Sequence, residues 1–395
     1  MCEPPVKKMK SVQFTGVESP RDDGEMDPEV AKRLLLEGAT LILLDVPPGT
    51  EIGIDMNSWN IGDKFRGVKM IPPGLHFVYY SSVNIKDRTT APRTGFFYNF
   101  GRGELVARRW SRQEEDIVDT VTEEDRERMK ADLLNLDRNL GSYPYSSWKK
   151  WISLSNRISD ATLQRLEPIN RKISSVTDMI PDSRDRTDMT SSNNDDVRLP
   201  CMSARPGTEV RYTNLWKQKY PEGSSAEEIT RHSMDGSYQL TKFIGQLDKL
   251  YGDQVSSSMS DRSHAQEILA ELQFSFLCFL VGMNYDSFEH WKELVVMMCS
   301  CDSALSVHPD LFMDFISDLY FQMQEVPRDF FVDIVSSDNF LCSCLNTLFS
   351  NMRSTQGVPQ KLKLKCEKFE TNVKKKFGWD FDIVPEDEEP VVVVL

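Results

Sequence analysis

Residues that could carry catalysis are few in this sequence, and their spacing matches no familiar arrangement. Nucleophilic catalysis needs a nucleophile held against a base, and metal-dependent hydrolysis needs ligands at fixed intervals. The 395-residue chain contains no G-x-S-x-G, H-E-x-x-H, G-x-x-x-x-G-K-S/T or G-x-G-x-x-G segment. We therefore expect no catalytic residue and no cofactor, with an enzyme of unfamiliar site as an alternative. The five histidines are His76, His232, His264, His290 and His308.

Two of these histidines lie in strongly patterned segments. His76 alternates with Leu75 and Phe77, so we expect a solvent-facing strand residue rather than a base. His290 lies beside a helical stripe that contains Phe288 and Trp291, so we expect a polar residue at the edge of a core.

Two C-x-C pairs, Cys299/Cys301 and Cys342/Cys344, are candidate metal ligands. Structural zinc sites use pairs separated by two to four residues, and side chains two positions apart on a helix point away from each other. Both pairs lie in or beside apolar helical runs. We therefore expect free, buried or half-buried thiols and no metal site, in a reducing compartment, since the N-terminal segment has no apolar signal region.

The last residues are the least ordinary feature of the chain. An acidic spacer, residues 385–390, precedes four consecutive valines and a leucine. Such a run favours extended structure, and an exposed apolar strand aggregates unless it pairs. It could pair with this protein's own sheet, or add a strand to the open edge of a partner's sheet, which we favour. The candidate docking residues are Val391, Val392, Val393, Val394 and Leu395.

A lysine-rich segment, residues 361–376, is expected to be the last helix. A solvated face is the simplest interpretation, and a contact with RNA or with an acidic protein is the alternative. The net charge of −14 would repel nucleic acid, so we expect protein partners and little direct binding of nucleic acid. The candidate partner contacts in this helix are Lys374, Lys375 and Lys376.

The elements that must position these residues change in kind along the chain. A short helix is expected from Pro28 to the stop at Gly38, followed by about six short strands separated by Pro/Gly turns over residues 39–111. The last two, 93–100 and 104–110, are expected to form a hairpin. Helices follow over residues 122–166. This pattern predicts an antiparallel sandwich or barrel with flanking helices.

Beyond a polar segment, the sequence predicts five or six packed helices, arranged as a bundle or a short solenoid, and one of these is expected to run from Ala226 to Leu250. No apolar stretch is long enough to span a bilayer. The fold class is therefore a two-domain α+β chain. We expect a disordered extension (1–25), a β-rich domain (26–170), a mobile linker (171–205), an all-α domain (206–380) and the spacer with its tail (381–395).

Several strings in the chain resemble the Aar-two family of splicing factors, in its animal form. The resemblance runs from about residue 26 to the end of the chain. The strings are MDPEVAKRLLLEG at 26–38, GVKMIPPG at 67–74, KKWISL at 149–154, ELQF at 271–274, FEHWK at 288–292 and DFFVDIV at 329–335.

The resemblance implies a β-rich N-terminal domain, an all-α domain similar to a VHS superhelix, and no catalytic residues. It also implies a role in assembly of the U-five small nuclear ribonucleoprotein, in nucleus and cytoplasm. The partner would be the large central U-five protein, bound at its RNase H-like domain, and binding would delay entry of the spliceosomal helicase. The resemblance further implies that the C-terminal tail adds a strand to a partner sheet.

Overall fold

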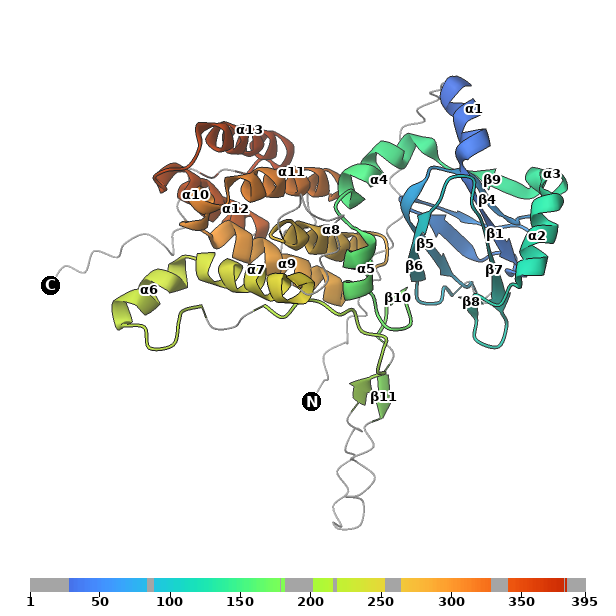
Figure 1. The fold of residues 1–395 in the computed structure, drawn as a ribbon, viewed down its shortest axis with the longest axis horizontal. Helices are drawn as coiled ribbons and strands as arrows, with labels where there is room; N and C mark the ends of the chain where they lie inside the picture. The colour runs from blue at the N-terminus through green and yellow to red at the C-terminus, as the bar shows by residue number, and fades with distance from the viewer. Residues whose placement is uncertain are drawn as a thin grey trace, which may run out of the picture.

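The computed structural model describes residues 28–83, 89–177, 179–181, 202–215, 219–252, 264–327, 340–379 and 381. A β-rich region lies beside a helical region, and helices α4 and α5 lie between the two (Figure 1). The prediction of a β-rich N-terminal part and a helical C-terminal part is confirmed.

The β-rich region contains two five-stranded sheets that share a core. Sheet A has the order β8-β7-β1-β4-β9 and sheet B the order β10-β6-β5-β2-β3. Apolar side chains such as Leu41 and Val106 from sheet A meet Ile54 and Val78 from sheet B between them. The strands are β1 (Ala39–Leu44), β2 (Glu51–Ile54), β3 (Asn57–Asn60), β4 (Gly67–Ile71), β5 (Gly74–Ser81), β6 (Thr94–Phe100), β7 (Leu105–Ser111), β8 (Asp116–Val118), β9 (Leu140–Ser142) and β10 (Ile173–Ser174).

Strand pairing differs from the prediction in two respects. β6 pairs with β5 in sheet B, whereas β7 pairs with β1 in sheet A, so the predicted β6–β7 hairpin is wrong. The turn at residues 101–103 instead carries the chain from one sheet to the other. β1–β7 and β4–β9 are parallel pairs, and neither sheet closes, so the purely antiparallel and barrel predictions are also wrong. Hydrophobic alternation identifies strands but does not specify their partners.

Helices cover the outer faces of both sheets. α1 (Pro28–Glu37) ends before Gly38, as predicted, and α2 (Glu123–Ala131) begins at the N-cap Thr122, whose side chain accepts a hydrogen bond from the amide of Asp125. α2 and α3 (Leu133–Leu136) cover sheet A. α4 (Trp148–Ser155) and α5 (Asp160–Leu166) lie on the side of sheet B (Figure 1).

The helical region holds the eight helices α6 to α13 among the described residues. The helix predicted over 226–250 is two helices, because Asp235 accepts hydrogen bonds from the amides of Ser237 and Asp302 and holds the chain in a turn. No helix in the described part of the chain combines the length and apolarity needed to cross a bilayer. The helices are α6 (Ala226–Met234), α7 (Ser237–Gly252), α8 (Gln266–Leu280), α9 (Tyr285–Ser300), α10 (Ala304–Val307), α11 (Pro309–Glu325), α12 (Phe340–Ser354) and α13 (Gln360–Phe377).

One hydrophobic core extends through both regions. Phe97 of β6 lies 5.1 Å, between ring centroids, from Phe274 of α8. Trp151 of α4 is fully buried in the same cluster and donates a hydrogen bond to the carbonyl of Leu75 in β5 (2.6 Å). The segment predicted as a linker also contributes, since Ile173 of β10 pairs with the edge of sheet B and is buried. The two regions are therefore packed against each other. Residues 182–201 of that segment lie outside the described residues, as do 1–27 and 382–395.

His76 is buried, contrary to the solvent-facing prediction. Its phase in β5 is as expected, opposite to Phe77, but both faces of this strand are covered. His76 Nδ1 lies 2.6 Å from Asp55 Oδ2 and its Nε2 lies 2.8 Å from the carbonyl oxygen of Pro72. Tyr143 donates to the same carboxylate at 2.6 Å. The Asp55 carboxylate is thus satisfied from three directions, since the amide of Phe77 also donates to it.

Tyr143→Phe tests how much this buried network stabilises the fold. Loss of the hydroxyl removes a hydrogen bond to a charged group, so we expect the free energy of unfolding to fall by about 1.5–3 kcal/mol. The same change at the exposed Tyr285 should stay within about 0.5 kcal/mol. Urea unfolding midpoints measure both, and equal effects at the two positions would contradict a stabilising role for the network.

Candidate protein-binding surface

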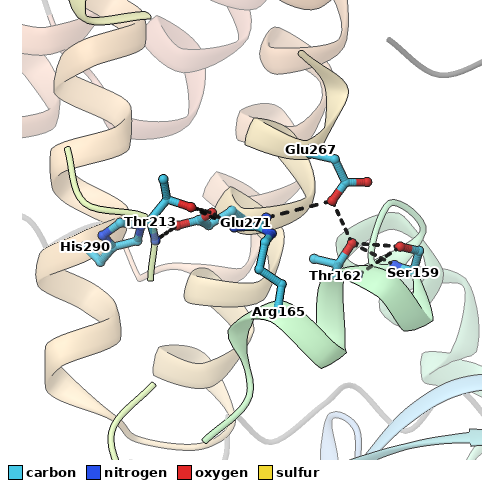
Figure 2. A network of polar contacts seen from close by, with 7 residues as sticks. All are labelled: Ser159, Thr162, Arg165, Thr213, Glu267, Glu271 and His290. Carbon is cyan, nitrogen blue, oxygen red and sulfur yellow. Dashed lines mark hydrogen bonds and ion pairs between the residues drawn. The ribbon is translucent and has the colours of Figure 1, made fainter. Parts of the chain in front are cut away.

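A second buried network joins the β-rich side of the molecule to the helical side, and Figure 2 shows its members. Glu271, on α8, has no solvent exposure. Its Oε1 lies 2.8 Å from His290 Nε2 on α9 and accepts a hydrogen bond from the amide of Thr213 (2.8 Å). Its Oε2 accepts hydrogen bonds from Arg165 Nη1 on α5 (2.5 Å) and from the Thr213 hydroxyl (2.8 Å). Three segments therefore converge on one carboxylate.

The electrostatics of this carboxylate follow from its surroundings. Burial alone would raise the pKa of Glu271, but the hydrogen bond from His290 and the charge of Arg165 outweigh it and hold the pKa below its usual value. Glu271 is therefore ionised inside the core. His290, expected at the edge of the core, is instead buried and stacks on Tyr212 with ring centroids 4.0 Å apart.

One turn earlier on α8, Glu267 extends the network to the start of α5. Thr162 donates to Glu267 Oε2 at 3.0 Å, and its amide donates to the hydroxyl of Ser159, the N-cap of α5 (Figure 2). The capping interactions of α5 and the buried charge of α8 are thus parts of one hydrogen-bonded system.

Arg157, between α4 and α5, forms a comparable junction with α8 and α11. Its guanidinium donates to Asp318 Oδ2 (Nε, 2.6 Å) and to Gln266 Oε1 (Nη1, 3.0 Å). Its amide donates to Gln273 Oε1 at 2.9 Å. Burial is the largest influence on Asp318 and raises its pKa to about 6, against the opposing charge of Arg157. The segment from α4 to α5 is therefore bound to the helical region by polar contacts as well as by apolar packing.

These clusters contain acids and bases, but their carboxylates and imidazoles are buried inside the hydrophobic cores. His76 and Glu271 are almost completely inaccessible. A separate open depression of about 900 Å³ lies at the ends of β1, β5 and β7 and is lined by groups such as Trp110 and Arg112, with no histidine or cysteine. The depression and the buried networks lie in different parts of the molecule.

The four cysteines of the two C-x-C pairs have the burial that the sequence predicts. Cys299 and Cys301 are buried, Cys342 and Cys344 are half-buried, and all four are free thiols. Burial raises the pKa of Cys344 to about 12, which keeps this thiol protonated. Among the described residues, no cluster of three or more His, Cys, Asp or Glu could hold a metal ion.

The structure gives different positions to the three lysines predicted as partner contacts. Lys376 donates to the carbonyls of Met323 (2.5 Å) and Gln324 (2.9 Å) at the end of α11. Lys374 pairs with Glu370 at 3.2 Å. Lys375 is exposed. The predicted docking residues Val391, Val392, Val393, Val394 and Leu395 lie outside the described residues.

Sequence reasoning missed the residues that join the two regions, chiefly Arg157, Arg165 and Glu271. A signal for Glu271 existed, because a charged residue within the apolar run ILAELQF needs a buried partner. The identity of that partner depends on tertiary packing.

Glu271→Gln should destabilise the fold strongly, because it leaves Arg165 facing an uncharged group inside the core. We expect a loss of about 3 kcal/mol in the free energy of unfolding. Glu289→Gln on the surface of α9 is the matched control and should cost less than about 1 kcal/mol, since Glu289 pairs with Lys292 in partial exposure. Denaturant unfolding of both variants measures the difference, and comparable losses would exclude a special role for the buried carboxylate.

Glu167, at the end of α5, should make stability depend on pH. Burial raises its pKa to about 7, against the charges of Arg171 and Arg211. A raised pKa means that the folded state holds the proton more tightly, so this contribution is complete below about pH 4.3 and is lost as pH rises through about 7. Glu167→Gln should flatten the decline between about pH 5 and 8. Unfolding midpoints across that range test this, with exposed Glu127→Gln as the control, whose slope should match the unmodified protein.

Comparison with known proteins gives matches over most of the chain. A sequence model of the AAR2 N-terminal domain matches residues 37–168, and one of the AAR2 C-terminal repeat region matches residues 212–382. The protein AAR2 homolog of Homo sapiens is 46% identical over 387 residues, which covers 94% of this chain and 97% of the relative. The Caenorhabditis elegans homolog is 35% identical, covering 91% and 99%.

A more distant relative carries a functional name. The A1 cistron-splicing factor AAR2 of Saccharomyces cerevisiae is 22% identical over 333 residues, covering 81% of this chain and 86% of the relative. The family matches and the animal relatives together confirm the resemblance found in the sequence strings. The chain belongs to the AAR2 family.

Proposed function

We propose that this protein is a non-enzymatic factor in pre-mRNA splicing that acts by binding another protein. The observation that carries the proposal is its membership, over nearly its whole length, in a family whose yeast member is named a splicing factor. The closed character of its acid–base clusters agrees with a binding role.

The partner that we propose is the large central protein of the U-five small nuclear ribonucleoprotein, contacted at its RNase H-like domain. Binding would delay entry of the spliceosomal helicase, in both nucleus and cytoplasm. We further propose residues 26–170 and 206–380 as the two structural units, joined by 171–205, with a VHS-like superhelix in the second. The separate family matches to 37–168 and 212–382 support this division.

The structure suggests how such a factor would work. The shared core and the Arg157 and Arg165 contacts hold the two regions in one orientation. A rigid scaffold loses little conformational entropy on binding, so a broad surface and the Val391–Leu395 tail could engage one partner together. The tail would add a strand to an open sheet edge of that partner.

Direct RNA binding through the lysine-rich last helix is less favoured by the geometry. Lys365 donates to the carbonyl of Met313 (2.6 Å), and Lys376 is similarly engaged with α11. Lysines committed to internal carbonyls contribute little to phosphate binding. The net charge of −14 also opposes it.

Affinity capture with the full chain tests the proposal. The bait should retain the large U-five protein from nuclear and cytoplasmic extracts treated with ribonuclease, as identified by mass spectrometry. Deletion of residues 385–395 should reduce retention by about tenfold, since strand addition contributes main-chain hydrogen bonds.

The control replaces Val391–Leu395 with serines and keeps the acidic spacer, and it should match the deletion if strand addition carries the effect. Undiminished capture by both variants would exclude the tail from the mechanism. Failure of the unmodified chain to retain any splicing component would overturn the proposed function itself.

A further inference from the structure

The outward face of α13 carries a stripe of lysines. At 100° per residue, positions 361, 364, 368 and 375 fall within about 60° of one another around the helix axis. All four side chains are exposed. We call this surface, made by Lys361, Leu364, Lys368 and Lys375, the lysine stripe. It extends for about 21 Å along the helix.

The lysines of the stripe differ from the others on the same helix. Lys365 and Lys376 donate to carbonyls of α11, and Lys374 pairs with Glu370. Lys361, Lys368 and Lys375 form no ion pair or hydrogen bond with another described residue. The stripe is therefore a positively charged surface without a partner in the described part of the chain.

The chain that follows α13 turns back toward this helix. Gly378 adopts a left-handed conformation (φ 73°), and its amide donates to the carbonyl of Lys374. Phe381 is 5% exposed, and its ring lies 5.0 Å from the ring of Phe349 on α12. The ammonium of Lys374 lies 5.9 Å from the same Phe381 ring. Residue 381 is thus anchored beside the last turn of α13.

The sequence beyond this anchor has the complementary charge. Residues 386–389 are Glu-Asp-Glu-Glu, whereas α13 has seven lysines and two glutamates. Extended chain covers at most about 3.4 Å per residue, so residue 386 can reach about 17 Å from Phe381 and residue 389 about 27 Å. Because the Phe381 ring lies 5.9 Å from the ammonium of Lys374, the neighbour of Lys375, both reaches include the C-terminal end of the stripe.

We propose that the acidic spacer, residues 386–389, binds the lysine stripe of its own chain. Each surface ion pair is weak, but the anchor at Phe381 gives the spacer a high effective concentration at the helix. The contact would hold Val391–Leu395 next to α13 until a competing partner releases it. It is a property of the isolated chain and does not depend on the splicing partner.

Carbodiimide cross-linking of the full chain tests the contact, because this reagent joins lysines directly to nearby carboxylates. Peptides containing Lys361, Lys368 or Lys375 should be linked to residues 386–389, with a yield that falls as salt is raised. Equal mixtures of isotope-labelled and unlabelled protein show whether the cross-linked carboxylate belongs to the same chain as the lysine or to a second copy. Cross-links within one label support the proposal, whereas mixed-label cross-links would assign the stripe to a second copy and overturn it.

Charge variants supply the matched control. Reversal of the stripe (K361E, K368E and K375E) should reduce protection of the tail against an added protease by about fivefold, as expected for loss of several surface ion pairs. Reversal of three exposed lysines elsewhere (K64E, K130E and K249E) should leave it unchanged. Combining the stripe reversal with reversal of the spacer (E386K, D387K, E388K and E389K) restores opposite charges on the two surfaces, so it should restore protection. If the stripe reversal leaves protease protection of the tail unchanged, the proposal is wrong, whatever the capture experiment shows about splicing partners.

Discussion

The ionised carboxylate of Glu271 at the centre of α8 constrains the rest of the structure. A charge without solvent exposure is tolerated only where hydrogen bonds and an opposite charge compensate for lost hydration. The partners of Glu271 come from α5, from α9 and from the loop that contains Thr213. Helix α8 can therefore take its place only when the segment leading out of the β-rich region is also in place. The packing of Phe97 on Phe274 extends this dependence into sheet B.

The elements that the sequence predicts well are those with local signals. α1 ends at Gly38, α2 starts at Thr122 and α13 ends at Gly378, because caps and glycines act within a few residues. Strand partners are a different matter. Four residues separate β6 from β7, yet the two strands lie in separate sheets. β1 pairs in parallel with a strand more than sixty residues away. The residues within a strand do not specify which distant strand it will pair with.

The candidate protein-binding surface also has features that the sequence predicts and features that depend on tertiary packing. A lysine-rich amphipathic helix is visible in the sequence, but the roles of its lysines are not. Lys376 and Lys375 are neighbours in sequence, yet one caps the end of α11 and the other is exposed. The difference depends on which side of α13 faces α11. His76 gives the complementary case, since its strand phase is predicted correctly and its burial depends on a second sheet packed over that face.

The core shared by β6, α4 and α8 also determines how the polypeptide can be divided. A break in the chain between β11 (Met179–Pro181) and β12 (Met202–Ala204) would leave two fragments held together by aromatic packing and by the Arg157 and Arg165 ion pairs. Fragments produced separately would each present an uncovered apolar surface, around Phe97 in one and Phe274 in the other. Co-expressed pieces should therefore assemble into a native-like particle, whereas a single piece should aggregate. The shared core therefore predicts that the β-rich and helical regions unfold together, in one transition.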